Sequence, residues 1–168
     1  MNLRQRAAWL GVLGVVATAA ACGDGRADAE PVSVASTLDE TDASLPTVTV
    51  YKSPTCGCCS GWADQMRRAG FPVEVHEMSD LSGLKADAGV PPRLQSCHTA
   101  TVGDYVLEGH VPADLVKKML EEKPEIAGLA VPGMPRGSPG MEMPNGAKDA
   151  YDVVAFTAEG SSSVYAHR

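Results

Sequence analysis

The sequence SPTCGCCSGW, residues 53–62, contains three cysteines within four positions: Cys56, Cys58 and Cys59. Cys56 and Cys59 form a C-x-x-C motif. The alternating run TVTVY at 47–51 ends before this motif, with four residues between them, and predicts a strand. When such a motif lies at the start of a helix, the helix dipole and the free N–H groups stabilise a thiolate. This arrangement is typical of thioredoxin-like redox proteins.

The residues after the motif predict a helix and a second strand. Trp62, Met66 and Ala69 recur at helical spacing, as the apolar face of a helix does. The segment FPVEVHEM at 71–78 alternates apolar and polar residues, which predicts a strand with one buried face. A short helix is expected within 80–88. The chain therefore begins with the order strand, helix, strand.

The second half of the chain predicts a hairpin, a helix and one more strand. HTATV at 98–102 and DYVLEGH at 104–110 are expected to pair as a hairpin, and PADLVKKMLEEK at 112–123 has a helical apolar face. YDVVAFTAEG at 151–160 predicts the last strand. This order is that of the thioredoxin fold. We expect an α/β, thioredoxin-like domain: a central mixed β-sheet flanked by helices, with a long Gly/Pro/Met-rich loop at 128–146.

The N-terminus has the features of an export signal. Residues 1–21 contain two arginines and then an uncharged, mostly apolar run of about 15 residues, which is too short to cross a bilayer. We interpret residues 1–21 as a signal peptide. The sequence Ala19-Ala20-Ala21-Cys22 also resembles a bacterial lipoprotein cleavage box, which would make Cys22 the lipidated first residue of the mature protein. Simple cleavage near Ala21 is the alternative.

Composition divides the rest of the chain into two parts. Residues 22–46 are acidic and small, so we expect a flexible tether, and residues 47–168 have the length of one thioredoxin-like metal-binding domain. The net charge of −7 without a basic cluster argues against nucleic-acid binding. The predicted location is the periplasm, with membrane contact only through a lipid anchor on Cys22.

A fourth cysteine of the predicted domain, Cys97, lies just before the predicted hairpin. In a thioredoxin fold this loop faces the C-x-x-C turn, so four sulfurs would converge there. Disulfides could pair them in three ways. Alternatively they could bind Cu(I), Zn(II) or an iron–sulfur cluster, because such ions favour soft thiolates. The spacing of the cysteines does not choose among these metals.

Methionines and histidines add weaker candidate ligands. Met134, Met141 and Met143 lie in the Gly/Pro-rich loop, and thioether sulfur favours Cu(I) over zinc. His98 is next to Cys97, and His110 ends the second hairpin strand, so either ring could reach the cysteines. The other histidines are expected to be exposed, on a strand and on the C-terminal tail: His76 and His167.

Three segments resemble those of CopG-type proteins in the same order: YKSPTCGCCSGW (51–62), SCHTATVGDYVLEGHVPADLV (96–116) and GLAVPGMPRGSPGMEM (128–143). These are small exported proteins found with bacterial copper-resistance systems, classed as domain of unknown function 411. The resemblance covers nearly all of residues 47–157. It implies a thioredoxin-like fold, a proposed periplasmic copper redox role, and copper bound at four cysteines with the Met-rich loop nearby: Cys56, Cys58, Cys59 and Cys97.

Two functions are therefore expected as alternatives. The first is a periplasmic copper-binding protein of metal homeostasis or resistance. It would hold one or several Cu(I) ions on the four cysteines, change copper between Cu(I) and Cu(II), and work with periplasmic copper efflux or carrier proteins. The second is a thiol–disulfide oxidoreductase, in which Cys56 attacks a disulfide and Cys59 resolves it. Cys58 favours the first, since exchange needs only two thiols. Whether the protein is an enzyme is left open, and purely structural disulfides are a third option.

Overall fold

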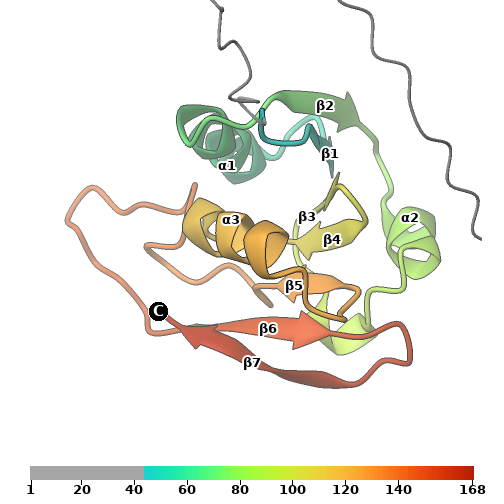
Figure 1. The fold of residues 1–168 in the computed structure, drawn as a ribbon. Helices are drawn as coiled ribbons and strands as arrows, with labels where there is room; N and C mark the ends of the chain where they lie inside the picture. The colour runs from blue at the N-terminus through green and yellow to red at the C-terminus, as the bar shows by residue number, and fades with distance from the viewer. Residues whose placement is uncertain (1–43) are drawn as a thin grey trace, which may run out of the picture. The chain divides into compact units, whose positions relative to one another are not determined.

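A computed structural model of the protein describes residues 44–168. The predicted signal peptide, the lipidation candidate Cys22 and most of the predicted tether lie outside the described residues. The described part is an α/β fold built on a mixed sheet of seven strands (Figure 1). The strands are β1 (Val48–Lys52), β2 (Val73–Glu77), β3 (His98–Val102), β4 (Tyr105–Glu108), β5 (Gly128–Ala130), β6 (Asp152–Phe156) and β7 (Ser162–His167).

The first four strands have the topology of the thioredoxin fold. The sheet order is β2-β1-β3-β4-β5-β6-β7. β1 pairs in parallel with β2 and antiparallel with β3, and β3 and β4 form the predicted hairpin. β5 then pairs in parallel with β4, and the antiparallel strands β6 and β7 extend the sheet further. The fold class expected from the sequence is confirmed.

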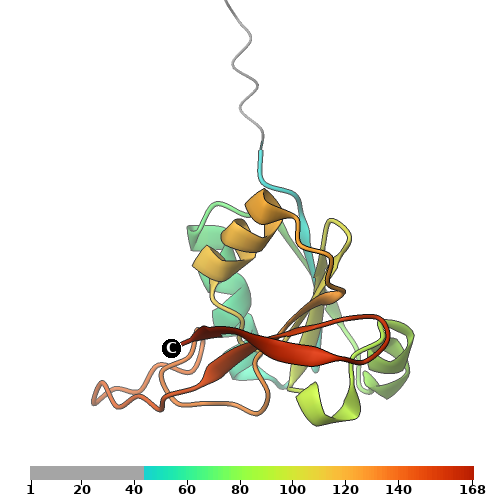
Figure 2. The ribbon, with the colours of Figure 1, turned by 60° about the horizontal axis from the view of Figure 1, so that its bottom comes forward.

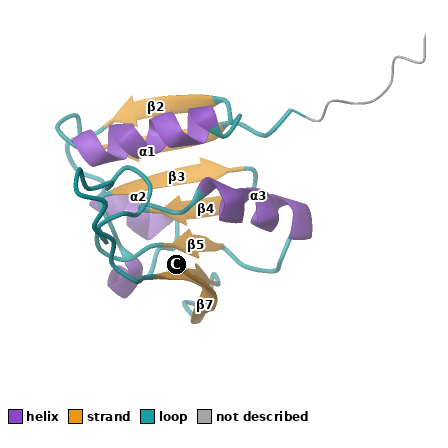
Figure 3. Ribbon diagram, turned by 90° about the vertical axis from the view of Figure 1, so that its left-hand side faces the viewer, coloured by secondary structure: helices purple, strands orange, loops and turns teal. Residues whose placement is uncertain are grey.

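Three helices cover the two faces of this sheet. α1 (Gly57–Arg68) and α3 (Ala113–Glu122) lie on one face, and α2 (Ser82–Asp87) lies on the other, as Figures 1 and 3 show. A short 3₁₀ helix, η1 (Pro92–Leu94), leads into the segment before β3. None of the helices between residues 44 and 168 is long and apolar enough to span a membrane.

The main core lies between the sheet and the pair α1 and α3. Trp62 and Met66 of α1 and Met119 of α3 are buried, and they pack with Val50 of β1 and Leu107 of β4. Burying a large apolar side chain stabilises the folded state by about 1.5–3 kcal/mol. The residues at helical spacing in the sequence are therefore those that attach α1, and with it the cysteine turn, to the sheet.

The structure corrects three expectations about individual strands. β2 is an edge strand, and its predicted inward residue Val75 is 37% exposed. β5 and β7 were not predicted: β5 has only three residues, and β7 is mostly polar.

His167, expected on a tail, lies in β7, where its Nδ1 is 2.6 Å from Asp152 Oδ1. His76 is exposed as predicted, and its ring stacks on Tyr51 at a centroid distance of 5.2 Å.

Candidate metal centre

The turn from β1 into α1 places three cysteines at one point of the fold. Cys56 is the N-terminal cap of α1, and it forms a disulfide with Cys59, whose side chain is fully buried. Cys58 Sγ lies 3.4 Å from Cys56 Sγ. Because α1 packs its Trp62 into the core, the cysteine turn is held against the end of the sheet rather than extended into solvent.

Cys97 meets this turn from the other side. It immediately precedes β3, which pairs with β1, so the end of β1 and the start of β3 bring the two cysteine segments together. The four Sγ atoms all lie within 4.8 Å of one another. Within residues 44–168, Cys58 and Cys97 are the free cysteines. The predicted convergence of these sulfurs is therefore present in the structure.

The donor set fits a soft metal ion. Two sulfurs on one tetrahedral metal ion, each about 2.3 Å from it, are about 3.8 Å apart. Apart from the disulfide-bonded pair Cys56 and Cys59, the Sγ atoms are at most 4.8 Å apart, and those of Cys56 and Cys58 are 3.4 Å apart. Reduction of the Cys56–Cys59 disulfide would free all four sulfurs to bind a metal ion as thiolates, the ligands that select Cu(I). Their clustering allows one ion, or several ions that share bridging sulfurs.

Two histidines contact Cys97. His110 Nε2 lies 3.0 Å from Cys97 Sγ, and His98 Nδ1 lies 3.4 Å from the same sulfur. His110 Nδ1 lies 2.7 Å from the carbonyl oxygen of Pro139. A carbonyl oxygen only accepts, so Nδ1 carries the ring proton and Nε2 presents its lone pair to Cys97. Both weaker histidine candidates from the sequence are therefore beside the cysteines, and both are fully buried.

Burial is the main cause of the pKa shifts of Cys97, His98 and His110. It lowers the pKa of His98 to about 3, and the electrostatic interactions with His110 and Lys85 act in the same direction. Burial also lowers the pKa of His110, although the hydrogen bond to Pro139 opposes it. Burial and then the nearby Cys58 raise the pKa of Cys97 to about 11. Without a metal, the group is therefore a cluster of neutral imidazoles and protonated Cys97, with lone pairs available for a cation.

The Gly/Pro/Met-rich loop between β5 and β6 lies against the cysteine turn. Besides the Pro139 contact with His110, Gly140 has φ +82°, and a Cβ on it would lie 2.5 Å from the Cys58 carbonyl oxygen. The Ser96 hydroxyl donates to the carbonyl of Gly133. The loop therefore touches the site at both cysteine segments, and Figure 2 shows it running beside the end of α1.

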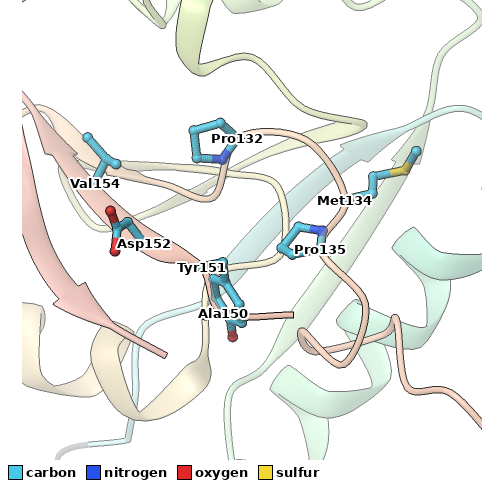
Figure 4. A pocket seen from close by; sticks show the side chains of 7 residues that line it. All are labelled: Pro132, Met134, Pro135, Ala150, Tyr151, Asp152 and Val154. Atoms are coloured by element: carbon cyan, nitrogen blue, oxygen red, sulfur yellow. The ribbon is translucent and has the colours of Figure 1, made fainter. Parts of the chain in front are cut away.

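The three methionines of this loop differ in exposure. The side chain of Met134 is 54% exposed and that of Met143 is 37% exposed, whereas Met141 is partly buried. Met134 borders a shallow hollow of about 530 Å³ together with Pro135 and Tyr151 (Figure 4). The lining of this hollow comes from the loop and from the residues at the start of β6, so it is separate from the cysteine cluster.

A buried polar network behind Cys97 was not anticipated from the sequence. Glu108 of β4 is fully buried and forms an ion pair with Lys85 of α2, between Oε1 and Nζ at 2.5 Å. The carboxylate also accepts from the Ser96 backbone N–H at 2.6 Å and from the Thr99 hydroxyl at 2.7 Å. It thereby holds the chain on both sides of Cys97. The one available signal was a glutamate ending an otherwise apolar strand, YVLE.

Known proteins resemble the chain in sequence and in structure. Residues 94–141 match a family described as "Protein of unknown function, DUF411". Two solved structures, both titled copper resistance protein CopG (forms 1 and 2), are 43% and 42% identical. Their TM-scores are 0.69 and 0.70, and each match covers 74% of this chain and 98% of the solved one. A search of proteins with curated functions finds no match. The chain therefore belongs to the CopG-type family of proteins with the DUF411 domain.

Proposed function

We propose that this protein binds copper as Cu(I) on Cys56, Cys58, Cys59 and Cys97, and that it serves in copper resistance in the periplasm. The observation that carries the proposal is the convergence of four sulfurs from two segments about 40 residues apart, with all Sγ atoms within 4.8 Å. The names of the solved relatives, both copper resistance proteins, support the choice of copper.

The number of sulfurs favours metal binding over exchange chemistry. A dithiol–disulfide exchange needs an attacking and a resolving thiol, and the two further sulfurs would compete for the mixed disulfide. A soft metal site uses all four. The burial of Cys59 argues against Cys59 as an attacking thiol. The raised pKa of Cys97 argues against Cys97 as a free nucleophile, because the thiolate is the reactive species.

The disulfide between Cys56 and Cys59 supports a redox component of this function. Oxidation of the two thiols forms the S–S bond and releases two electrons and two protons. Two Cu(II) ions can accept these electrons and become two Cu(I) ions, which the remaining sulfurs can bind. The same disulfide is the observation that favours the second candidate function, thiol–disulfide exchange with Cys56, the less buried partner, as the attacking residue.

Copper stoichiometry of the reduced protein tests the proposal. The protein is reduced without oxygen, titrated with Cu(I) against a chromophoric chelator, and compared with a variant in which Cys56, Cys58 and Cys59 are serine. We expect at least one tightly bound Cu(I) per wild-type chain and loss of tight binding in the variant. Absence of tight Cu(I) binding in the wild type, together with rapid disulfide reduction, would favour the oxidoreductase.

We also propose that the mature protein is anchored through a lipid on Cys22 and delivers copper to periplasmic efflux or carrier proteins. The support is the Ala19-Ala20-Ala21-Cys22 sequence and the acidic segment after it, which is long enough to separate the domain from a membrane. Mass spectrometry of the exported protein should find a diacylglyceryl group on an N-terminal Cys22. An unmodified N-terminus after Cys22 would exclude the anchor.

A further inference from the structure

The face of the sheet that carries α2 has an open groove of about 450 Å³. Tyr51 of β1 and Thr101 of β3 line it from the sheet, Leu84 and Ala88 line it from α2, and Met78 lines it from the segment between β2 and α2. All five residues are half-buried, so apolar surface stays open to solvent here. A mainly apolar hollow of this size is typical of a binding site.

Two carboxylates belong to the α2 side of this groove. Asp87 lines the groove directly, and Asp80 lies in the chain between Met78 and Gly83, which also line it. Both aspartates are exposed. Asp80 Oδ1 accepts a hydrogen bond from the backbone N–H of Ser82 at 2.9 Å, which lowers the pKa of Asp80. Its carboxylate is therefore fully charged at neutral pH.

A third carboxylate, Glu74, lies on the same face of the sheet. Residues two positions apart on a strand share a face, so Glu74 lies on the side of β2 that His76 marks. The ring of His76 stacks on Tyr51, which lines the groove. Glu74 is also exposed. Negative charge is therefore present on the β2 side of the groove as well as on the α2 side.

In the described part of the chain, no positive side chain at the surface of the groove offsets these carboxylates. Glu74, Asp80 and Asp87 form no ion pair within residues 44–168. Lys85 of α2 is buried and paired with Glu108, and no lysine or arginine among the described residues lines the groove. The groove is therefore apolar at its centre and negatively charged around it.

We infer that this groove binds a basic segment of another protein. An apolar side chain of the segment enters between α2 and the sheet, and its lysines or arginines face the three carboxylates. These carboxylates are spread over β2, α2 and the loop between them, so a length of chain reaches all three and a small cation does not. The site goes beyond copper binding, since it lies on the face of the sheet opposite α1, where the cysteine turn begins.

Charge disfavours the other occupants of the groove. Residues 23–46 of the same chain contain six acidic residues and one arginine, so they are repelled from it. The anionic surface of a membrane is repelled in the same way. A second copy paired through the same groove would bring two sets of carboxylates together. A partner segment of opposite charge is the occupant that the carboxylates attract.

The test is a fluorescence-anisotropy titration of the copper-free exported protein with the labelled peptide Lys-Lys-Ala-Trp-Ala-Lys-Lys. We expect binding that weakens as the salt concentration rises. Glu74→Gln with Asp87→Asn should weaken it roughly 2- to 30-fold, the range for loss of two exposed ion pairs. Leu84→Ser should weaken it at least about 5-fold, as expected for an apolar contact at the centre of an interface.

Matched control variants change the same charge or the same apolar group on α3 or just after it. They are Glu121→Gln with Glu125→Gln, and Leu120→Ser. Both should bind the peptide as the wild type does. Residues 23–46 are the same in every variant, so peptide bound to this acidic segment does not contribute to the differences.

Three results would overturn the proposal: no binding by the wild type, equal weakening by the control variants, or tryptamine bound as tightly as the peptide. The last result would assign the groove to a small cation. Should Leu84→Ser not fold, Thr101→Lys, which adds a cation to the groove, replaces it, and unchanged binding counts against the site. Cu(I) binding by the reduced protein is measured separately. The groove contains no cysteine, so failure of either activity leaves the other unaffected.

Discussion

Glu108 accepts a hydrogen bond from the backbone N–H of Ser96 at 2.6 Å, one residue before Cys97. Its other carboxylate oxygen accepts from Thr99, two residues after Cys97. Lys85 of α2 neutralises the buried negative charge of Glu108. The cysteine that completes the sulfur cluster is therefore positioned by a buried ion pair that links β4 to the helix on the opposite face of the sheet from α1.

Variants of Glu108 and Lys85 can show whether this ion pair positions Cys97 or only stabilises the fold. Glu108→Leu alone leaves Lys85 buried without a partner, and we expect a loss of about 3–5 kcal/mol in the free energy of unfolding. Glu108→Leu with Lys85→Met removes both charges, and most of the lost stability should be recovered. Ser96 and Thr99 still lack their acceptor in the double variant, so Cys97 should be alkylated faster than in the wild type.

Peptide mapping after timed alkylation of the disulfide-intact protein measures this effect, and Cys58 in the same molecule is the control. A double variant with wild-type stability and an unchanged Cys97 rate would mean that the ion pair does not position Cys97. Leu107→Ala, on the same strand but in the main core, provides a variant that is destabilised without contacting this network.

Acid should destabilise the metal-free protein through His98. Its pKa is about 3 in the folded protein and about 6.5 when unfolded, so between these values the unfolded chain binds more protons. This contribution to stability is complete above pH 6.5 and falls by about 1.4 kcal/mol per pH unit as the pH drops toward 3. Guanidinium unfolding at pH 6.5 and 4.5 should show a smaller loss in His98→Gln. Equal losses in both proteins would contradict the assigned pKa.

The contact between Gly140 and the cysteine turn can be tested with two alanine substitutions. Both Gly140 and Gly146 have positive φ, +82° and +71°, so each alanine pays about 1–2 kcal/mol for the left-handed backbone. Only at position 140 would the new Cβ also collide with Cys58 and Trp62. Gly140→Ala should therefore cost more stability than Gly146→Ala and should expose Cys58 to alkylation. Equal effects would mean that the loop does not pack on the turn in solution.

The sequence patterns that predicted the fold correctly are those set by local periodicity. TVTVY, the helical spacing of Trp62 and Met66, and the hairpin at 98–110 all reflect burial of one face, and the structure bears them out. From these elements alone, Cys97 could be placed opposite the C-x-x-C turn. Cys97 lies at the start of a strand, so its position follows from how that strand pairs in the sheet. The order of strands and helices along the chain predicts this pairing.

Other features depend on contacts that no short pattern contains. β5 has three residues in a Gly/Pro-rich segment, and its pairing with β4 and β6 exists only in the folded sheet. β7 is polar because it is an edge strand with exposed residues. Glu108 and Lys85 are 23 positions apart, so each alone resembles a surface charge in the sequence. The contact of Pro139 with His110 likewise depends on the path of an irregular loop.

The methionines of the loop should add to copper affinity if their thioethers serve as ligands or as a first binding surface. Replacing Met134, Met141 and Met143 together with leucine keeps size and apolarity but removes sulfur. We expect weaker Cu(I) binding or slower loading, measured by competition and stopped-flow mixing with a Cu(I) chelate. Met78→Leu, outside the loop, is the control. Unchanged affinity and loading would assign these methionines to packing alone.

A Cu(I) competition titration of reduced Cys97→Ser against the wild type decides whether Cys97 completes a four-sulfur copper site. A hydroxyl is a hard, weak ligand, so we expect lower Cu(I) capacity and affinity in the variant. Disulfide reduction by Cys56 and Cys59, assayed on both proteins, should be largely unchanged. Equal copper binding with lost reductase activity in Cys97→Ser would contradict the metal site and support the oxidoreductase.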